Sequence, residues 1–243
     1  MPDRANEFAE ELLNWYDVHR RDLPWRVGPD ARQEPYKIWL SEIMLQQTTV
    51  TAVISYYSKF LTRWPTVTKL AAASLDEVLH AWQGLGYYAR ARNLHKCAQV
   101  VVTKYGGHFP DNEAELMRLP GIGSYTAAAM SAIAFGKKAT PIDANIERVI
   151  SRVYAIEEPL PRSKKLVRTY AENLTPSRRY GDFAQALMDL GATICRPRLA
   201  NCGFCPVSEN CRAFKGEDPA RYPIKPARRK RPNRHGVVFW VER

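Results

Sequence analysis

Apolar side chains recur at helical spacing along most of this chain. Phe8, Leu12, Trp15 and Tyr16 form the first stripe, and the helix that they predict ends before Arg20. Later stretches with this spacing predict helices over 35–47, 53–63, 74–82, 87–105, 125–135, 144–153, 162–173 and 183–193. Alternation typical of strands does not appear before residue 235, and no repeat recurs at a fixed period. The pattern therefore predicts an all-α body.

The stretch from 35 to 47 differs from the others because its apolar side chains point to nearly every side, which indicates a buried helix. The positions that carry this pattern are Ile38, Trp39, Leu40, Ile43, Met44 and Leu45. Glu42 lies among them, and burial should raise the pKa of its carboxyl. Such a carboxyl suits a general acid at neutral pH. A structural glutamate paired with an arginine is the alternative that the sequence leaves open.

Three other places carry side chains suited to nucleic acid. Gln46 and Gln47 end the apolar face of that helix, where amides either reach bases or cap the helix. Tyr87 begins a predicted helix whose start also carries Arg90 and Arg92, although tyrosines at helix starts also pack. The loop before the buried helix, which we expect to be exposed, places Trp25 beside Arg26.

A glycine-rich turn precedes the predicted helix over 125–135. Gly121 and Gly123 stand two residues apart behind Pro120, and Ser124 follows at the expected helix start. Glycines let backbone N–H groups converge on an anion, and the positive end of the helix adds to that potential. The turn is therefore either a phosphate site or only a connector between helices.

Asp143 precedes the predicted helix over 144–153. A carboxylate in that place ordinarily caps the helix by accepting a backbone N–H. This interpretation holds unless a second acid faces Asp143.

The net charge of the chain indicates what kind of partner it binds. The 243 residues, enough for one large domain or two small ones, carry 36 Lys and Arg against 25 Asp and Glu, a formal net charge of +11. The sequence pI is about 9.5, so we expect a polyanionic partner, although a merely soluble basic protein has the same balance. The sequence holds no apolar run of about 18 residues and no signal-peptide core, which predicts an intracellular protein that does not act on membranes.

Four of the five cysteines cluster late in the chain. Cys195, Cys202, Cys205 and Cys211 are spaced C-x6-C-x2-C-x5-C, whereas Cys97 lies in an apolar helical pattern and is interpreted as core. In a reducing compartment, clustered thiols indicate zinc or a [4Fe–4S] cluster rather than disulfides. The spacing is not the paired C-x2-C pattern usual for zinc, and it leaves both metals open.

Three of these features follow one another in order: the Leu-Pro-Gly-Ile-Gly-Ser-Tyr turn at 119–125, Asp143, and the four cysteines. Together they resemble the helix-hairpin-helix DNA glycosylases related to endonuclease III. Three further motifs resemble the MutY-type adenine glycosylases of that family: Ser-Glu-Ile-Met-Leu-Gln-Gln-Thr at 41–48, Gly-Leu-Gly-Tyr-Tyr at 84–88 and Met-Asp-Leu-Gly-Ala at 188–192.

The resemblance, which covers about residues 8–214, implies a catalytic set. The residue matching Glu42 would protonate the adenine leaving group, and the one matching Asp143 would stabilise or attack the sugar cation. Asn145 would orient Asp143. Tyr125 stands where strand-cleaving relatives carry a Schiff-base lysine, so the chain would cut the glycosidic bond and leave the DNA backbone intact.

The resemblance also implies a DNA surface and a cofactor. Gln47 and Tyr87 would fill the base stack after an adenine is flipped out, and Gln185 would contact that base. The other positions that we expect at the DNA or in the base pocket are Leu45, Gln46, Trp25, Arg26, Gly121, Gly123 and Ser124. The four clustered cysteines would hold a structural [4Fe–4S] cluster that positions a basic loop on phosphate. The expected partner is double-stranded DNA with an A·8-oxoguanine or A·G mispair, bound by a monomer.

Two positions depart from the family pattern. Ala144 follows the expected catalytic Asp where relatives often have glycine, and Glu147 occupies a place that is often basic. Ala144 is tolerated at negative φ, whereas Glu147 could weaken a phosphate contact. Neither change removes a catalytic group.

Composition divides the chain into three parts. Residues 1–217 form the expected helical glycosylase domain, with its hairpin at about 113–135 and its cluster loop at 195–211. Residues 218–235, rich in Pro and Arg, predict a linker, and 236–243 predict a strand that has no partner. A Nudix-like domain begins about here in the resembled family, so we expect a truncated chain.

Three functions follow from these observations. The first is a monofunctional glycosylase of base excision repair that removes adenine opposite 8-oxoguanine or guanine. A thymine glycosylase for T·G mismatches is the nearest alternative, since that sister group can share Tyr125 and the Asp-Ala-Asn segment, but Glu42 with Gln46 and Gln47 favours adenine. A non-catalytic lesion-binding module is the third, and the presence of both acids argues against it.

Overall fold

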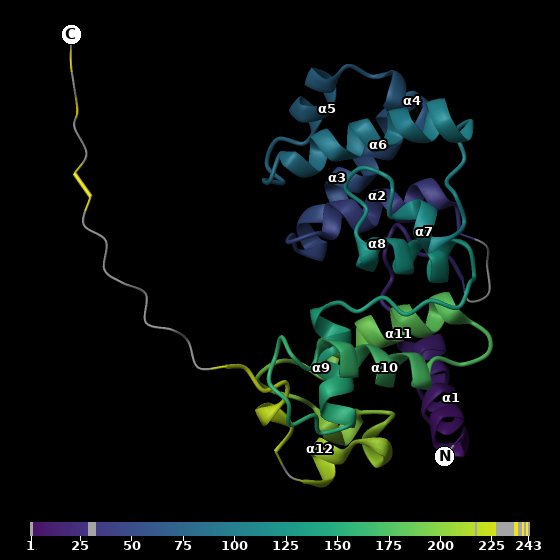
Figure 1. Cartoon of the computed structure of the whole chain (residues 1–243), viewed down its shortest axis with the longest axis vertical. Coiled ribbons are helices and arrows are strands. Elements are labelled where there is room, and N and C mark those ends of the chain that lie inside the picture. The colour runs from purple at the N-terminus through teal and green to yellow at the C-terminus, as the bar shows by residue number, and fades with distance from the viewer. Residues whose placement is uncertain are drawn as a thin grey trace.

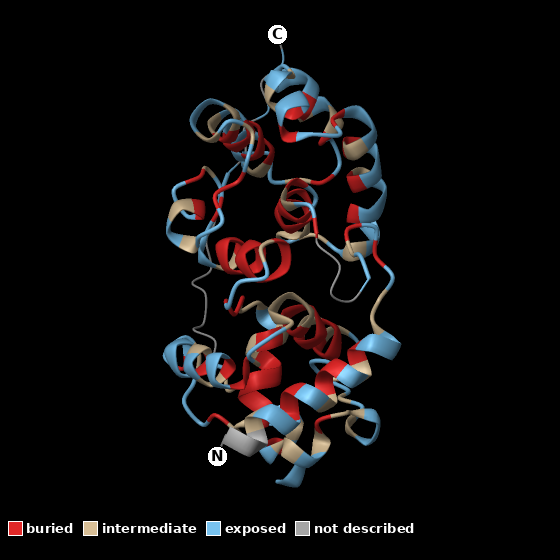
Figure 2. Cartoon of the chain, turned by 90° about the vertical axis from the view of Figure 1, so that its right-hand side faces the viewer, coloured by how far each residue is buried: buried red, intermediate tan, exposed pale blue. Residues whose placement is uncertain are grey.

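The computed structural model describes residues 2–28, 33–216, 218–226, 236, 237, 240 and 242. Its helices gather into two lobes, one above the other in Figure 1. The upper lobe holds the helices between residues 35 and 134, and the lower lobe holds the first helix together with those after residue 143. The N-terminal helix therefore packs with segments far later in the chain, and Figure 2 shows buried residues in the interior of each lobe.

The upper lobe is built around a helix that is buried on nearly all sides. Its elements are α2 (Pro35–Leu45), α3 (Val50–Arg63), α4 (Val67–Ala72), α5 (Leu75–Ala81), α6 (Ala89–Tyr105), α7 (Glu113–Leu116), α8 (Ser124–Ala129) and the π-helical turn η1 (Met130–Ala134). Trp39, Phe60 and Trp82 are fully buried in its core, where the rings of Phe60 and Trp82 meet edge to face at 5.8 Å. The apolar side chains on nearly every side of α2 are thus explained by its burial, as predicted.

The lower lobe contains α1 (Pro2–His19), α9 (Ala144–Val153), α10 (Lys164–Leu174), α11 (Tyr180–Thr193), η2 (Cys202–Phe204), η3 (Ser208–Asn210), α12 (Arg212–Lys215) and η4 (Pro219–Arg221). Leu12 of α1 shares its core with Ile150 of α9 and Leu187 of α11. A third, smaller apolar cluster of mostly small side chains joins the lobes. There a Cβ on Gly181 would lie 2.8 Å from the carbonyl oxygen of Ala132, so glycine lets α11 approach η1 closely.

Most of the predicted elements are present. The all-α prediction is confirmed for the described residues, none of which lies in a strand. Helix α2 ends at Leu45, two residues earlier than the pattern predicted, because the backbone of Gln46 leaves the helical region at ψ 113°. Gln47 follows at φ 55°.

The prediction of an exposed loop before α2 holds for Asp22, Pro24, Val27, Gly28 and Glu34 but is wrong for the two residues singled out in it, Trp25 and Arg26. Trp25 is buried with its ring edge against Tyr57, at a centroid distance of 5.4 Å, and the side chain of Arg26 is only 7% exposed. Single apolar residues in a loop have no periodicity, so the pattern could not reveal that Leu23 and Trp25 fill the core of the upper lobe.

The end of the chain differs in part from its sequence-based division. Residues 218–226, assigned above to a linker, stay on the lower lobe, where Arg152 Nε donates to the carbonyl of the buried Tyr222 at 3.1 Å. The predicted strand over 236–243 falls mostly outside the described residues. Within the described part of the chain, no helix combines the length and the apolar character needed to span a bilayer.

Candidate active site

A cavity of about 630 Å³ lies between the two lobes. The expected catalytic and base-pocket residues that line it are Glu42, Tyr125, Asp143, Asn145, Leu45, Gln46, Gln47, Gln185, Trp25 and Arg26. Tyr87 and the hairpin residues Gly121, Gly123 and Ser124 do not line it. The structure therefore brings one part of the predicted set together and places the other part elsewhere on the upper lobe.

Glu42 of α2 is 6% exposed on the wall of this cavity. Burial raises the pKa of its carboxyl to about 7, and the negative charge of Asp143 adds to the rise. A hydrogen bond from Tyr125 and the charge of Arg26 oppose it. The predicted burial and raised pKa of Glu42 are confirmed, and a carboxyl of this kind holds a proton in part of the molecules at neutral pH.

Tyr125 enters the cavity from the start of α8, directly after the glycine-rich turn. Burial, together with the negative charges of Glu42 and Asp143, raises the pKa of Tyr125 well above its usual value. Its hydroxyl therefore remains protonated and donates to Glu42.

Asp143 caps α9 and also faces a second acid. The backbone N–H of Ile146 donates to its Oδ1 at 2.7 Å, and Asn145 Nδ2 donates to its Oδ2 at 2.8 Å. Both oxygens are thus held in place, and the electrostatic interaction with Glu42 acts across the shared cavity. Asp143 therefore both caps α9 and lines the cavity.

Arg148 of α9 holds the other end of Asn145. Its Nη2 donates to Asn145 Oδ1 at 2.8 Å and to the carbonyl of Gly191 at 2.7 Å, while its Nε donates to the carbonyl of Cys195 at 2.7 Å. A Cβ on Gly191 would lie 2.6 Å from Asn145 Cβ. Only glycine therefore permits this approach of α11 to the amide that orients the Asp143 carboxylate.

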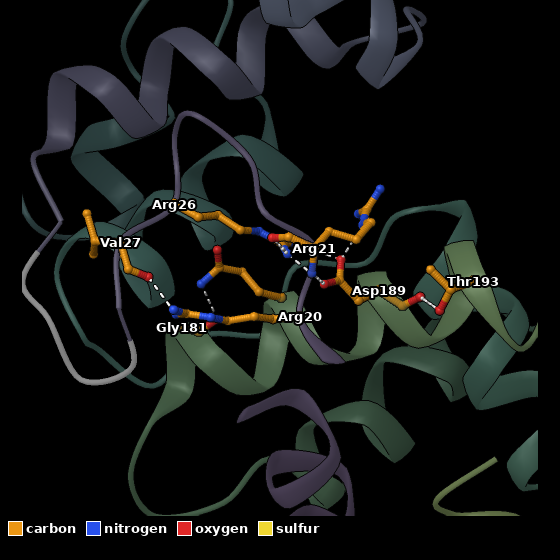
Figure 3. A network of polar contacts seen from close by, with 8 residues as sticks. Arg20, Arg21, Arg26, Val27, Gly181, Asp189 and Thr193 are labelled. Atoms are coloured by element: carbon orange, nitrogen blue, oxygen red, sulfur yellow. Dashed lines mark hydrogen bonds and ion pairs between the residues drawn. The ribbon is translucent and has the colours of Figure 1, made fainter. Parts of the chain in front are cut away.

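Asp189 of α11 gathers two arginines from the loop before α2, as Figure 3 shows. Arg26 forms a bidentate pair with it at 2.6 and 2.8 Å, and Arg21 donates through Nε at 2.7 Å and through its backbone N–H at 3.0 Å. Burial alone would raise the pKa of Asp189, but the bonds and charges of the arginines outweigh it and hold that pKa below its usual value. The network ties the loop to the lower lobe.

The residues expected to enter DNA lie on two turns of the upper lobe. Gln47 is exposed at φ 55°, and Tyr87 is 65% exposed at φ 47°. The hairpin turn has Gly121 at φ 78°, and Gly123 immediately precedes the first residue of α8, Ser124. The predicted turn into a helix start is therefore confirmed, whereas its phosphate contact stays a prediction.

The four clustered cysteines surround one small cavity of the lower lobe. Cys195, Cys202, Cys205 and Cys211 line it together with Arg152, whose Nη1 lies 3.3 Å from Cys195 Sγ. Among the described residues, no group of His, Cys, Asp and Glu has an arrangement that could hold a metal ion. Four thiols with a guanidinium beside them are nevertheless a donor set that would suit a [4Fe–4S] cluster. The fifth cysteine, Cys97, is buried in the upper lobe as predicted.

Sequence reasoning missed the roles of Asp189 and Arg148. Asp189 lies on α11 beside the buried Leu187 and Leu190. An acid in such an apolar helix needs a buried cation as its partner unless it stays protonated, so the apolar pattern was a signal that could have found this ion pair. Arg148 had no such signal, because its acceptors at Gly191 and Cys195 are backbone carbonyls far along the chain.

Comparisons with known proteins show what this chain is similar to. The family described as HhH-GPD superfamily base excision DNA repair protein matches residues 40–177. The chain is 46% identical to the human adenine DNA glycosylase over 214 residues, which cover 85% of this chain and 39% of that protein. It is 43% identical to the adenine DNA glycosylase of Mycolicibacterium smegmatis over 211 residues, which cover 86% and 70%.

A solved structure of a thermostable thymine-DNA glycosylase is also similar. It superposes with a TM-score of 0.79 at 35% identity and covers 88% of this chain and 98% of its own. The chain spans about two fifths of the length of the human relative but more than two thirds of the mycobacterial one.

Proposed function

The chain belongs to the HhH-GPD superfamily of base excision DNA repair proteins and to its MutY-type branch, and from that premise we propose that it removes mispaired adenine from DNA. The observation that carries the proposal is the pair of acids on one cavity. Glu42 is buried with a pKa of about 7, and Asp143 is fixed by two donors on the opposite lobe. The environments of these carboxyls fit two opposed tasks.

The reaction is a hydrolysis of the bond between the sugar C1′ and the adenine nitrogen. The flipped adenine would enter the cavity of about 630 Å³ between the lobes. Glu42 transfers its proton to the base, and the bond electrons leave with the base. Asp143 stabilises the sugar cation, and water then adds at C1′ and gives a proton to the solvent, from which Glu42 is protonated again. Asn145 and Arg148 keep the carboxylate of Asp143 in position during these steps.

Tyr125 determines whether the enzyme also cleaves the DNA strand. A phenol forms no imine with the sugar, so the product is an abasic site in an intact strand. Its hydroxyl instead keeps Glu42 oriented through their hydrogen bond. The chain therefore acts as a monofunctional glycosylase.

The cysteine cavity and the exposed turns complete the proposal. Cys195, Cys202, Cys205 and Cys211 would hold a [4Fe–4S] cluster, which when bound supplies a rigid, charged support for the surrounding loop. Arg196, Arg198 and Arg212, with the net charge of +11, would contact phosphates, as would the hairpin at Gly121 and Gly123.

The base pocket is the remaining part of the proposal. Gln185 would contact the flipped adenine from α11, while Trp25, Arg26, Leu45 and Gln46 would enclose it. In the free protein, the Gln185 amide donates to the carbonyl of Gly181 at 3.2 Å, which leaves its oxygen available to a base.

Removal of thymine from T·G mismatches is the second candidate function, because the thymine-DNA glycosylase structure covers the same two lobes at 35% identity. Single-turnover assays on duplexes with A·8-oxoguanine, A·G and T·G mispairs separate the candidates. We expect adenine release from the first two duplexes and little from the third. Thymine release alone would support the second function, and binding without release of either base would support a lesion-binding module.

A further inference from the structure

Two turns of the upper lobe have the same unusual backbone. Gln47 follows the end of α2, and Tyr87 precedes α6, and both residues have φ in the left-handed region at 55° and 47°. Residues other than glycine rarely adopt this conformation unless neighbouring groups impose it. Some feature of the surrounding structure must therefore hold both turns.

The guanidinium of Arg90 contacts both turns at once. Its Nη1 donates to the carbonyls at the end of α2, those of Met44 at 2.9 Å and Gln46 at 2.6 Å. Its Nη2 donates to the carbonyls that precede Tyr87, those of Leu85 at 2.8 Å and Gly86 at 3.3 Å. One planar group thus bridges two backbone segments that are far apart in the sequence.

Two further side chains bind the second turn without reaching the first. Tyr56 of α3 donates its hydroxyl to the carbonyl of Gln83 at 2.7 Å, and Trp82 Nε1 donates to that of Gly86 at 3.0 Å. The Arg90 guanidinium also stacks near the rings of Trp82 and Tyr87, at 5.2 and 5.7 Å from their centroids. The position of Tyr87 is therefore coupled, through Arg90, to the turn that carries Gln47.

We propose that Arg90 is a positioning residue that sets the spacing between Gln47 and Tyr87, so that both enter a mispaired duplex as one unit. The inference rests on the proposed function, in which these two side chains occupy the base stack. Arg90 itself faces protein carbonyls rather than DNA, since its Nη donors are used by the two turns. A lysine cannot replace it, because its single ammonium group lacks the two separate Nη groups with which the planar guanidinium donates to both turns.

Amide hydrogen exchange on the purified, metal-loaded protein tests the coupling without DNA. Arg90→Lys should speed exchange in both turns, residues 46–48 and 84–88, by about tenfold. Tyr56→Phe, which removes one bond to the second turn alone, should affect only 84–88. Arg168→Lys, on a partly exposed arginine of the lower lobe, serves as the control and should change neither.

DNA binding provides the second measurement, made in a Glu42→Gln background to prevent turnover. Arg90→Lys should weaken binding to an A·8-oxoguanine duplex about tenfold, and binding to a fully paired duplex less than about threefold, because the positive charge is kept. Faster exchange in only one turn, exchange raised throughout the lobe, or an equal loss on both duplexes would each overturn the proposal. Absence of excision by the unmodified chain would overturn the proposed function instead, while the exchange result would still decide the role of Arg90.

Discussion

Replacing Glu42 by glutamine should abolish excision and at the same time make the protein more stable above neutral pH. The carboxyl has a pKa of about 7 in the folded chain, against 4.5 for an ordinary glutamate. Because the folded pKa is the higher one, the folded chain binds more protons than the unfolded chain between these two values. The stabilisation by protonated Glu42 is therefore fully present below pH 4.5 and is lost as the pH rises through about 7.

The magnitude follows from the same two values. At about 1.4 kcal/mol per pKa unit, ionising the buried carboxyl at pH 8 costs the folded state roughly 3 kcal/mol. Glutamine keeps the shape and has no charge to bury, so Glu42→Gln should gain up to that amount at pH 8 and nothing at pH 4.5. For a chain of this length, this corresponds to a rise in melting temperature of up to about 10 °C. A gain of this kind is expected where function requires an unfavourable buried group.

Thermal unfolding of both proteins at pH 5, 6, 7 and 8, at one scan rate and with the metal bound, measures the effect. Single-turnover excision is followed at the same pH values, where the rate should fall as Glu42 loses its proton, and the variant should be inactive throughout. Glu10→Gln, on the exposed face of α1, is the matched control and should show the pH dependence of the unmodified chain. The quantity to compare is the difference in melting temperature between Glu42→Gln and the unmodified chain. If that difference is no larger at pH 8 than at pH 5, the reasoning is refuted.

Four further outcomes follow from the structure. Purified protein should be brown with about four irons per chain, and metal analysis that finds about one zinc and no iron would exclude the cluster. Tyr125→Lys should gain some strand cleavage, because an amine would then reach the sugar carbon, and borohydride trapping of a covalent complex measures it. Gly191→Ala should lower the single-turnover rate about tenfold or more with little change in DNA affinity, because the new methyl group displaces Asn145 and with it the Asp143 carboxylate. Binding to duplex DNA should weaken steeply with salt, and a binding constant that does not change between low and high salt would mean that the basic residues face elsewhere.

Much of the fold could be predicted from local patterns. The period of apolar residues predicted most of the helices. The one expected over 74–82 begins in the structure with a capping box, in which the backbone N–H of Glu77 donates to Ser74 Oγ at 3.2 Å. The division into lobes could not be predicted in this way. Helix α1 joins α9 and α11 through contacts between distant parts of the chain, which no local period encodes.

The candidate site was predictable where burial alone creates the chemistry. A carboxyl in a helix that is apolar on all sides has either a raised pKa, as at Glu42, or a cation beside it, so Glu42 could be singled out without a structure. The contacts that set its neighbours in place could not be found, because the acceptors of Arg90 and Arg148 are mostly backbone carbonyls. Every residue carries such a carbonyl, so the sequence offers no sign of which ones are used.

The two acids come from different lobes, so their spacing depends on how the lobes meet. Glu42 belongs to the upper lobe and Asp143 to the lower one. Arg26, from the loop that packs into the upper lobe, is fixed by Asp189 of the lower lobe, and its charge also lowers the pKa of Glu42 against the effect of burial. The Arg26–Asp189 ion pair therefore helps to fix the position of one lobe against the other, and its arginine also lowers the proton affinity of Glu42. Without that charge, burial and Asp143 would raise the pKa of Glu42 further, and the acid would hold its proton too strongly to transfer it readily to a leaving base.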